Sequence, residues 1–184
     1  MYPIVVDSSP IVKSAGREHL PGIAEIYGHY VETSIATFEL EVPDEAEWAR
    51  RFAAITDSGL PFLVAELDDK VAGYAYCSPW KTRPAYRQTV EDSVYVAPWA
   101  VGHGLGGLLL DTVVERCDAL GIREIIAVIA DTQGASPALH HRRGFVDAGR
   151  LRNVGFKHGR RLDTVLMQRS LGQSNSAGSV PSQA

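Results

Sequence analysis

Apolar residues recur along the chain with two periods, one typical of amphipathic helices and the other typical of strands. Spacings of three and four place Ile23, Ile26 and Tyr27 on one stripe and predict a helix over residues 18–33. Alternation predicts a strand over residues 89–96. The same two periods predict strands over 10–14, 62–67, 71–80, 125–130, 145–152 and 161–169, and helices from Pro43, over 105–120 and over 136–143. This order predicts a single mixed α/β domain over residues 10–170.

Some of these elements carry a more detailed prediction. Pro43 is expected to open the second helix, because proline suits a first helical position. The continuous apolar run 125–130 is typical of a strand covered on both faces. The last two strands are expected to be joined by a loop that holds Lys157 and His158. The helix over 105–120 is expected to bury its apolar positions 105, 108, 109, 112, 113, 117 and 120.

Composition narrows the class of protein. The 184 residues are 45% hydrophobic and 22% charged, as in an ordinary globular protein. A net charge of −4 argues against nucleic-acid binding, although basic residues cluster late in the chain. The chain shows no long apolar run and no leader pattern, so neither a membrane span nor export is expected. Cys77 and Cys117 are expected to be buried and unpaired, which favours the cytoplasm. No metal is expected, and residues 171–184 are expected to be a disordered tail.

A glycine-rich run joins the strand over 89–96 to the helix that follows it. Gly102, Gly104, Gly106 and Gly107 leave backbone N–H groups open at a helix N-terminus, which favours a phosphate group. The spacing does not fit a dinucleotide fingerprint, and no lysine follows as in a Walker loop. The run therefore predicts an anion site of another kind, with a purely structural glycine turn as the alternative.

Several segments together carry a resemblance to a known family. They are His29–Ser34 with Phe38, Pro79–Tyr86, Val90–Val96, the glycine run, Ser136–Phe145 and Gly155–Gly159. On these residues the chain resembles the GNAT acyl-CoA N-acyltransferases and, within them, the phosphinothricin N-acetyltransferase group. The resemblance implies the GNAT fold, a central mixed, mostly antiparallel sheet flanked by helices, and acetyl-CoA as the co-substrate.

The resemblance also implies where acetyl-CoA binds. Its pyrophosphate is expected on the glycine loop, and its pantetheine arm beside the strand, like an extra strand. The residues implied are Val94, Tyr95, Val96, Gly102, His103, Gly104, Leu105, Gly106, Gly107 and Gln133. Val101 and His103 stand where the family usually has Gln or Arg and a basic residue, and Gln133 stands where it usually has Asn.

An amine attacks a thioester only after losing its proton, so a general base is required. The resemblance implies Glu91 as that base and His140 as a second catalytic residue. Taken alone, Glu91 also fits a strand-edge carboxylate in a salt bridge, and His140 a surface or capping residue. A backbone N–H near Tyr95 or Val96 is expected to stabilise the oxyanion. The proton donor to the leaving thiolate stays open between a tyrosine and a serine.

The acceptor in the resembling group is a small amino acid with an anionic or strongly polar side group, such as phosphinothricin, methionine sulfone or methionine sulfoximine. Lys81, Arg83 and Tyr86 are expected to hold its charged groups, and Phe38 its aliphatic part. The alternatives are a solvated loop for the basic pair and ordinary core for Phe38. Family members are often homodimers, which implies one here.

Two other functions stay open on the sequence. One is acetylation of a peptide or protein N-terminus, and the other is a non-catalytic acyl-CoA-binding module. Resistance to a herbicide-like compound and general detoxification would leave the same sequence features.

Overall fold

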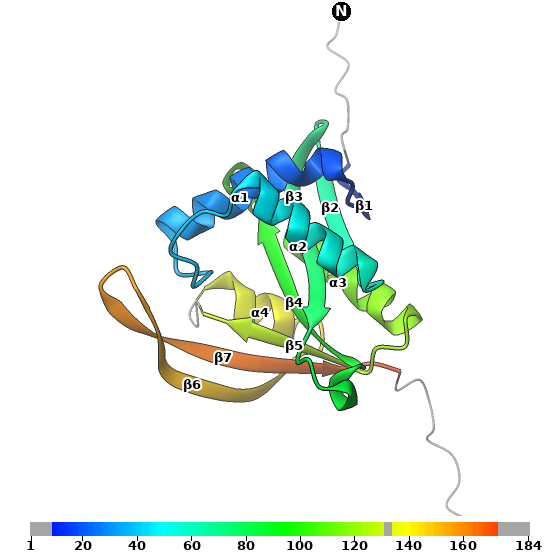
Figure 1. Ribbon diagram of the computed structural model, residues 1–184, viewed down its shortest axis with the longest axis vertical. Helices are drawn as coiled ribbons and strands as arrows, with labels where there is room; N and C mark the ends of the chain where they lie inside the picture. The colour runs from blue at the N-terminus through cyan, green and yellow to red at the C-terminus, as the bar shows by residue number, and fades with distance from the viewer. Residues whose placement is uncertain (1–8, 131–133, 173–184) are drawn as a thin grey trace, which may run out of the picture.

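The computed structural model describes residues 9–130 and 134–172, and a single mixed sheet forms its centre (Figure 1). Within these residues the strand order is β1-β2-β3-β4-β5-β7-β6. β4 and β5 run parallel, and every other pair of neighbours is antiparallel. The strands are β1 Ile11–Ser14, β2 Phe62–Leu67, β3 Lys70–Pro79, β4 Thr89–Val96, β5 Glu124–Ile129, β6 Val146–Lys157 and β7 Arg160–Ser170.

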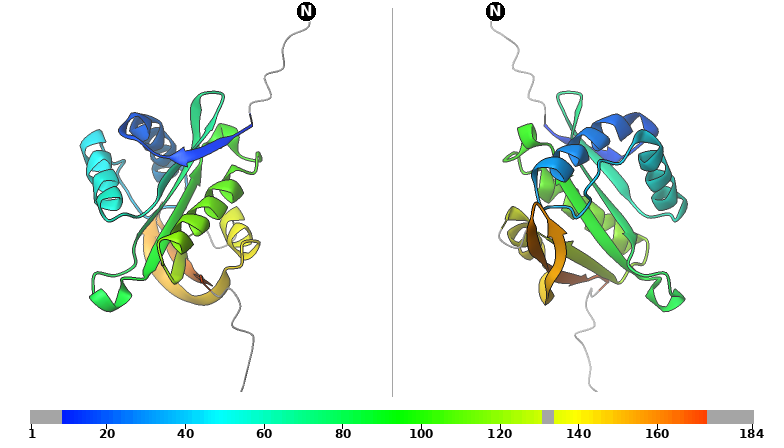
Figure 2. Two further views of the ribbon diagram at one scale, coloured as in Figure 1. Left: turned by 90° about the vertical axis from the view of Figure 1, so that its right-hand side faces the viewer. Right: turned by 60° about the vertical axis from the view of Figure 1, so that its left-hand side comes forward.

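Helices cover the two faces of this sheet in pairs. α1 Leu20–Thr33 and α2 Glu45–Asp57 lie on one face, and α3 Leu105–Ala119 and α4 Ala135–His141 lie on the other (Figure 2). Short 3-10 turns complete the order at Arg17–His19, Pro84–Tyr86 and Pro98–Ala100. The predicted order of helices and strands and the predicted fold class are therefore confirmed.

The second helix begins two residues later than expected. Asp44 is its N-cap, and the Asp44 side chain accepts a hydrogen bond from the backbone N–H of Glu47. The first amides of a helix have no acceptor within the helix, and the Asp44 carboxylate supplies one. The helix therefore begins after Asp44 and not at Pro43. The helix then buries Trp48, whose ring meets Tyr27 and Tyr74 edge-on.

The strand β5 is not covered on both faces, and this prediction was wrong. Its burial alternates, and Val128 is 37% exposed. Val128 lies just beyond Ala127, the last residue of β5 that pairs with β4, and lines the cavity described below. The buried stripe of α3 also differs from the predicted one. Leu108 and, just after the helix, Leu120 are exposed, whereas Leu110 and Val114 are buried.

The last two strands form one long hairpin, where a loop had been expected. β6 and β7 pair as far as Lys157 and Arg160, and only His158 and Gly159 turn the chain, both with positive φ. Two register shifts interrupt the pairing, and most of β6 is exposed. Residues 153–157 include an asparagine and a glycine, which strands disfavour, so their local sequence does not predict a strand there. The hairpin curves away from the sheet, and its turn reaches the connection between α1 and α2 (Figure 1).

The end of the domain lies slightly beyond residue 170. Leu171 is buried and donates its backbone N–H to the carbonyl of Arg123. The rest of the expected tail, residues 173–184, lies outside the described residues, as does Gln133. None of the described helices is both long and apolar enough to cross a bilayer.

Candidate active site

A cavity of about 780 Å³ opens where β4 and β5 separate. This volume suits a small-molecule ligand. Most of its walls come from α1 and the connection between α1 and α2, the second halves of β4 and β5, the glycine loop with the start of α3, and α4. Segments far apart in the sequence therefore meet around one space.

The second half of β4 presents unpaired main-chain groups to this cavity. Trp80 donates its N–H to the carbonyl of Thr89, and Ala97 donates its N–H to the carbonyl of Ala72. Hydrogen-bonded and non-hydrogen-bonded pairs alternate along an antiparallel ladder, so these two bonds determine which amides of β4 face β3. By that alternation Tyr95 bonds to β3, whereas Val94 and Val96 direct their N–H groups toward β5. Pairing with β5 ends at Asp92, so these amides face the gap between the strands. The Tyr30 hydroxyl donates to the Val96 carbonyl at 2.7 Å.

The glycine loop lies at the same end of the cavity. Gly102 and Gly104 have φ of +93° and +76°, a region that only glycine enters without strain. Gly104 is the N-cap of α3, so the first amides of that helix point out of the loop without an intrahelical acceptor. The predicted residues that line the cavity here are Gly102, Gly104, Leu105, Gly106 and Gly107. His103 does not line it, and its Nδ1 lies 3.2 Å from the Ala100 carbonyl oxygen.

Glu91 lies on β4, one residue before the strands part, and its half-buried side chain lines the cavity. Burial raises the pKa of Glu91 above its ordinary value, and the charge of Asp92 adds to that rise. The charge of Lys81 acts in the opposite direction. A carboxyl with a raised pKa is a stronger base when ionised than an exposed one.

His140 and Asp92 form a buried pair on the opposite face of β4. Nε2 of His140 lies 3.0 Å from Oδ2 of Asp92, and Nδ1 lies 2.8 Å from the carbonyl oxygen of Ser136. A ring protonated on both nitrogens would donate to both of these oxygens. Burial alone would lower the pKa of His140, but the hydrogen bond and charge of Asp92 outweigh it and raise that pKa.

The predicted acceptor residues separate into two groups. Phe38 lines the cavity from the connection between α1 and α2. Lys81, Arg83 and Tyr86 are exposed and do not line it, because the segment between β3 and β4 projects beyond the sheet (Figure 2). The Lys81 ammonium lies over the Trp80 ring, 4.5 Å from its centre. A single chain thus does not bring these three side chains to Phe38.

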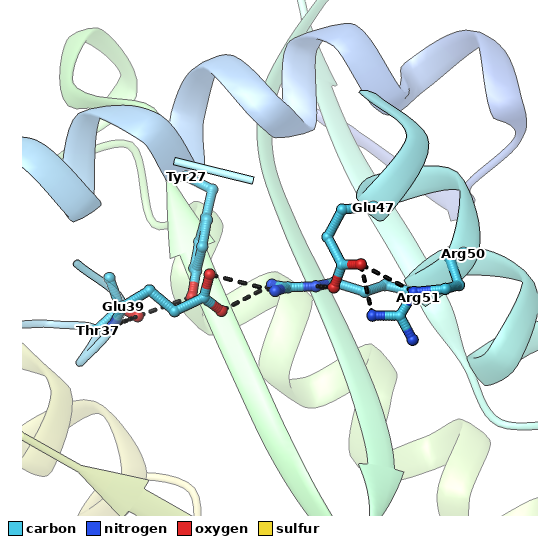
Figure 3. A network of polar contacts seen from close by, with 6 residues as sticks. All are labelled: Tyr27, Thr37, Glu39, Glu47, Arg50 and Arg51. Carbon is cyan, nitrogen blue, oxygen red and sulfur yellow. Dashed lines mark hydrogen bonds and ion pairs between the residues drawn. The ribbon is translucent and has the colours of Figure 1, made fainter. Parts of the chain in front are cut away.

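A network of polar side chains that no sequence pattern predicts supports the cavity wall (Figure 3). The Tyr27 hydroxyl lies 2.7 Å from Oγ1 of Thr37 and donates to Glu39 at 2.9 Å. Arg51 on α2 donates two hydrogen bonds to the carboxylate of Glu39 and one to Glu47. These residues come from α1, α2 and their connection, and no local motif links them. The network fixes Thr37, which lines the cavity next to Phe38.

Two further residues at the cavity were missed. Asp92 had not been singled out, because a carboxylate within a strand has no distinctive pattern until its partner His140 is known. Arg142 follows α4 and lines the cavity with the glycine loop. In the sequence it belonged only to a general basic cluster.

Within the described ranges, no group of three His, Cys, Asp or Glu side chains could hold a metal ion. Cys77 and Cys117 are both buried and unpaired, with their sulfur atoms 3.5 Å apart in the core.

Comparisons with known proteins agree with this geometry. The model of the acetyltransferase (GNAT) family matches residues 23–145. A phosphinothricin N-acetyltransferase of Alcaligenes faecalis is 50% identical over 161 residues, which cover 87% of this chain and 82% of that protein. An L-methionine sulfoximine/L-methionine sulfone acetyltransferase of Pseudomonas paraeruginosa is 38% identical over 170 residues, 92% of this chain and 99% of that protein. A phosphinothricin acetyltransferase from Sinorhizobium meliloti, crystallised with acetyl-CoA, matches with a TM-score of 0.87 and 44% identity over 94% of each chain.

Proposed function

The chain belongs to the GNAT acetyltransferase family and is an acetyl-CoA-dependent N-acetyltransferase, and we propose that it acetylates the primary amine of a small α-amino acid with a strongly polar side group. The observation that carries this proposal is the half-buried Glu91 at the point where β4 and β5 part. A base at this point can reach an amine that enters from the α1 and α2 side.

We propose that the glycine loop and the second half of β4 hold acetyl-CoA, which supplies the acetyl group as a thioester. The fit rests on two features of this chain. The loop offers open amides at the start of α3, which suit a pyrophosphate. The amides of Val94 and Val96 face the gap between β4 and β5, which suits an arm that carries its own amide groups. The register favours Val96 over Tyr95 as an oxyanion donor, because the Tyr95 amide is directed to β3.

Glu91 is proposed as the general base. Its carboxylate takes one proton from the acceptor ammonium, directly or through a water molecule. The free amine would then attack the thioester carbonyl, the new C–N bond would form as the C–S bond breaks, and the second proton lost by the nitrogen would pass to the departing CoA thiolate. Its raised pKa supports this role, because a base works best when its pKa approaches the operating pH.

His140 is proposed as a positioning residue and not as a base. An imidazolium that donates from both nitrogens has no lone pair with which to take a proton. Its contacts with Asp92 and Ser136 instead hold α4 against β4 beside Glu91.

The proposed acceptors are phosphinothricin-like and methionine sulfone-like amino acids, because relatives at 50% and 38% identity bear those substrates in their names. Phe38 is proposed to pack against the aliphatic part. Since Lys81, Arg83 and Tyr86 do not line the cavity of their own chain, we propose that they contact the acceptor only within a homodimer. Acetylation of a herbicide-like acceptor would then confer resistance to it, and the unpaired cysteines favour a reducing cytoplasm as the compartment.

The test is release of CoA by the purified protein with acetyl-CoA and a panel of acceptors. The panel contains phosphinothricin, methionine sulfone, methionine sulfoximine, ordinary amino acids and a peptide. Fast turnover of the first three, lost in Glu91→Gln, supports the proposal. Turnover of the peptide alone would contradict the acceptor class, and binding of acetyl-CoA without any turnover would contradict the enzymatic role.

A further inference from the structure

Gly155 lacks a side chain for a reason that is steric and not conformational. It lies on β6, is buried, and has no left-handed backbone, unlike Gly149 and Gly159 of the same hairpin. Its backbone would accept any residue. A Cβ atom at this position, however, would lie 2.5 Å from Cζ of Phe38, and real Cβ contacts do not fall below 3.0 Å. The missing side chain therefore makes room for the Phe38 ring.

The ring of Phe38 separates Gly155 from the cavity. Phe38 is one of the cavity-lining residues, whereas Gly155 is not. The ring thus rests with one side on the strand β6 and presents another to the space that an acceptor would occupy.

The two neighbours of Phe38 are held by hydrogen bonds, through their side chains and through one backbone carbonyl. On one side Tyr27 and Arg51 hold Thr37 and Glu39 through the network described above (Figure 3). On the other side the buried ammonium of Lys157 donates to the Thr37 carbonyl at 2.9 Å. Any atom added behind Phe38 must therefore displace the ring itself, because rotation of a side chain costs less than breaking several charged hydrogen bonds.

We propose that Gly155 is a specificity-determining residue of this acetyltransferase, because it lets the Phe38 ring lie back against β6 and so sets the length of acceptor side chain that the cavity admits. The inference rests on the proposed function, since it assumes that the acceptor lies beside Phe38. A larger residue at position 155 shortens the space for the acceptor.

The test compares three sulfones of increasing length, S-methylcysteine sulfone, methionine sulfone and ethionine sulfone, in the wild-type protein and in Gly155→Ala. We expect kcat/KM of the variant to fall about tenfold or more for the two longer acceptors and much less for the shortest, in the range that one methylene produces in a tight pocket. Phe156→Leu, on the other face of β6, is the matched control and should keep the wild-type ratios. Acetyl-CoA binding, measured by calorimetry, should be equal in all proteins.

Rescue distinguishes a steric effect from a folding defect. Phe38→Leu in the Gly155→Ala background removes the ring edge that the new methyl group would meet. For the longer acceptors, kcat/KM of this double variant should lie within about threefold of that of Phe38→Leu alone, as expected when two residues in contact are coupled. An equal loss for all three acceptors, or no rescue, would overturn the inference.

A crystal structure of Gly155→Ala gives a readout that does not depend on the acceptor. A Phe38 ring displaced into the cavity supports the inference. A ring that stays in place while β6 shifts away overturns it. If the wild-type protein turns over none of the sulfones, the proposed function fails. The crystal structure of Gly155→Ala then still shows whether a side chain at position 155 displaces the Phe38 ring.

Discussion

The two halves of the cavity are built from different parts of the polypeptide. One half, which we call the strand half, consists of residues 94–107, a single stretch in which main-chain amides face the cavity. The other, the wall half, consists of side chains from α1 and the α1–α2 connection, supported from behind by β6, and these segments meet only in the folded protein. The strand half fits a ligand shared by a whole family, and the wall half fits one that differs between members.

The difference has a physical basis. Backbone amides bind phosphates and amide groups whatever the side chains are, so the strand half tolerates departures such as Val101 and His103. The wall half works through shape and charge, where one carbon atom changes binding by a measurable amount. Substitutions in the strand half should therefore act on acetyl-CoA, and substitutions in the wall half on the acceptor.

The largest effect is expected at Glu91, where the two halves meet. Glu91→Gln should lower kcat by about a hundredfold or more, because the amide cannot take the amine proton. Acetyl-CoA binding should stay unchanged in calorimetry. In the wild-type protein, kcat/KM should fall as the pH is lowered through the raised pKa of Glu91, because only the ionised carboxylate is a base. Glu45→Gln, at an exposed position on α2, is the control. If Glu91→Gln kept most of the wild-type activity, Glu91 would not be the general base.

The next effect concerns stability beside the strand half, at the buried pair of Asp92 and His140. Asp92→Asn should lower the free energy of unfolding by about 3 kcal/mol, because it leaves the buried imidazolium of His140 without its counter-charge. The pKa of His140 is raised in the folded state, so the pair's contribution is fully present below the unfolded pKa of about 6.5 and is lost as the pH rises through the folded one.

Thermal or urea unfolding between pH 5 and pH 9 measures this effect. Asp147→Asn is the control, because Asp147 pairs with His141 at the surface, where such pairs contribute little. A stability difference between wild type and Asp92→Asn that grows with pH would contradict the charged pair.

A smaller effect is expected from the cation beside the glycine loop. Arg142→Ala should raise KM for acetyl-CoA by about tenfold at low salt and less at high salt, since an exposed charge is screened. KM for the acceptor should stay the same. Arg116→Ala, in the last turn of α3 and away from the cavity, should change neither constant. If KM for the acceptor rose instead, Arg142 would belong to the acceptor site and not to the acetyl-CoA site.

The smallest effect is expected from the network behind the wall half. Arg51→Gln should raise the acceptor KM by about threefold with little change in kcat, because Glu39 and Thr37 lose a support without touching the reacting atoms. Arg50→Gln is a close match, since Arg50 contacts Glu47 in the same network but not Glu39 (Figure 3). Equal kinetics for the two variants would show that the network does not position the wall.

The prediction of Phe38 and the lack of any prediction for Gly155 illustrate how far sequence reasoning reached. Phe38 was reached through the family resemblance, and the structure has it on the cavity. Gly155 was one residue of a motif, and the strand that holds it was expected to be a loop. Its meaning depends on a contact across more than a hundred residues, which no local pattern encodes.

The sequence by itself determined the order of helices and strands, the glycine loop at the start of α3 and the family, because periodicity, capping and turn chemistry act over a few neighbouring residues. Tertiary structure alone decided that β4 and β5 part after Asp92, that His140 has a buried carboxylate partner, and that Lys81, Arg83 and Tyr86 lie outside the cavity. It also decided that β6 bends over to support Phe38. Those features depend on which distant surfaces can be buried together, and that is a property of the whole packed chain.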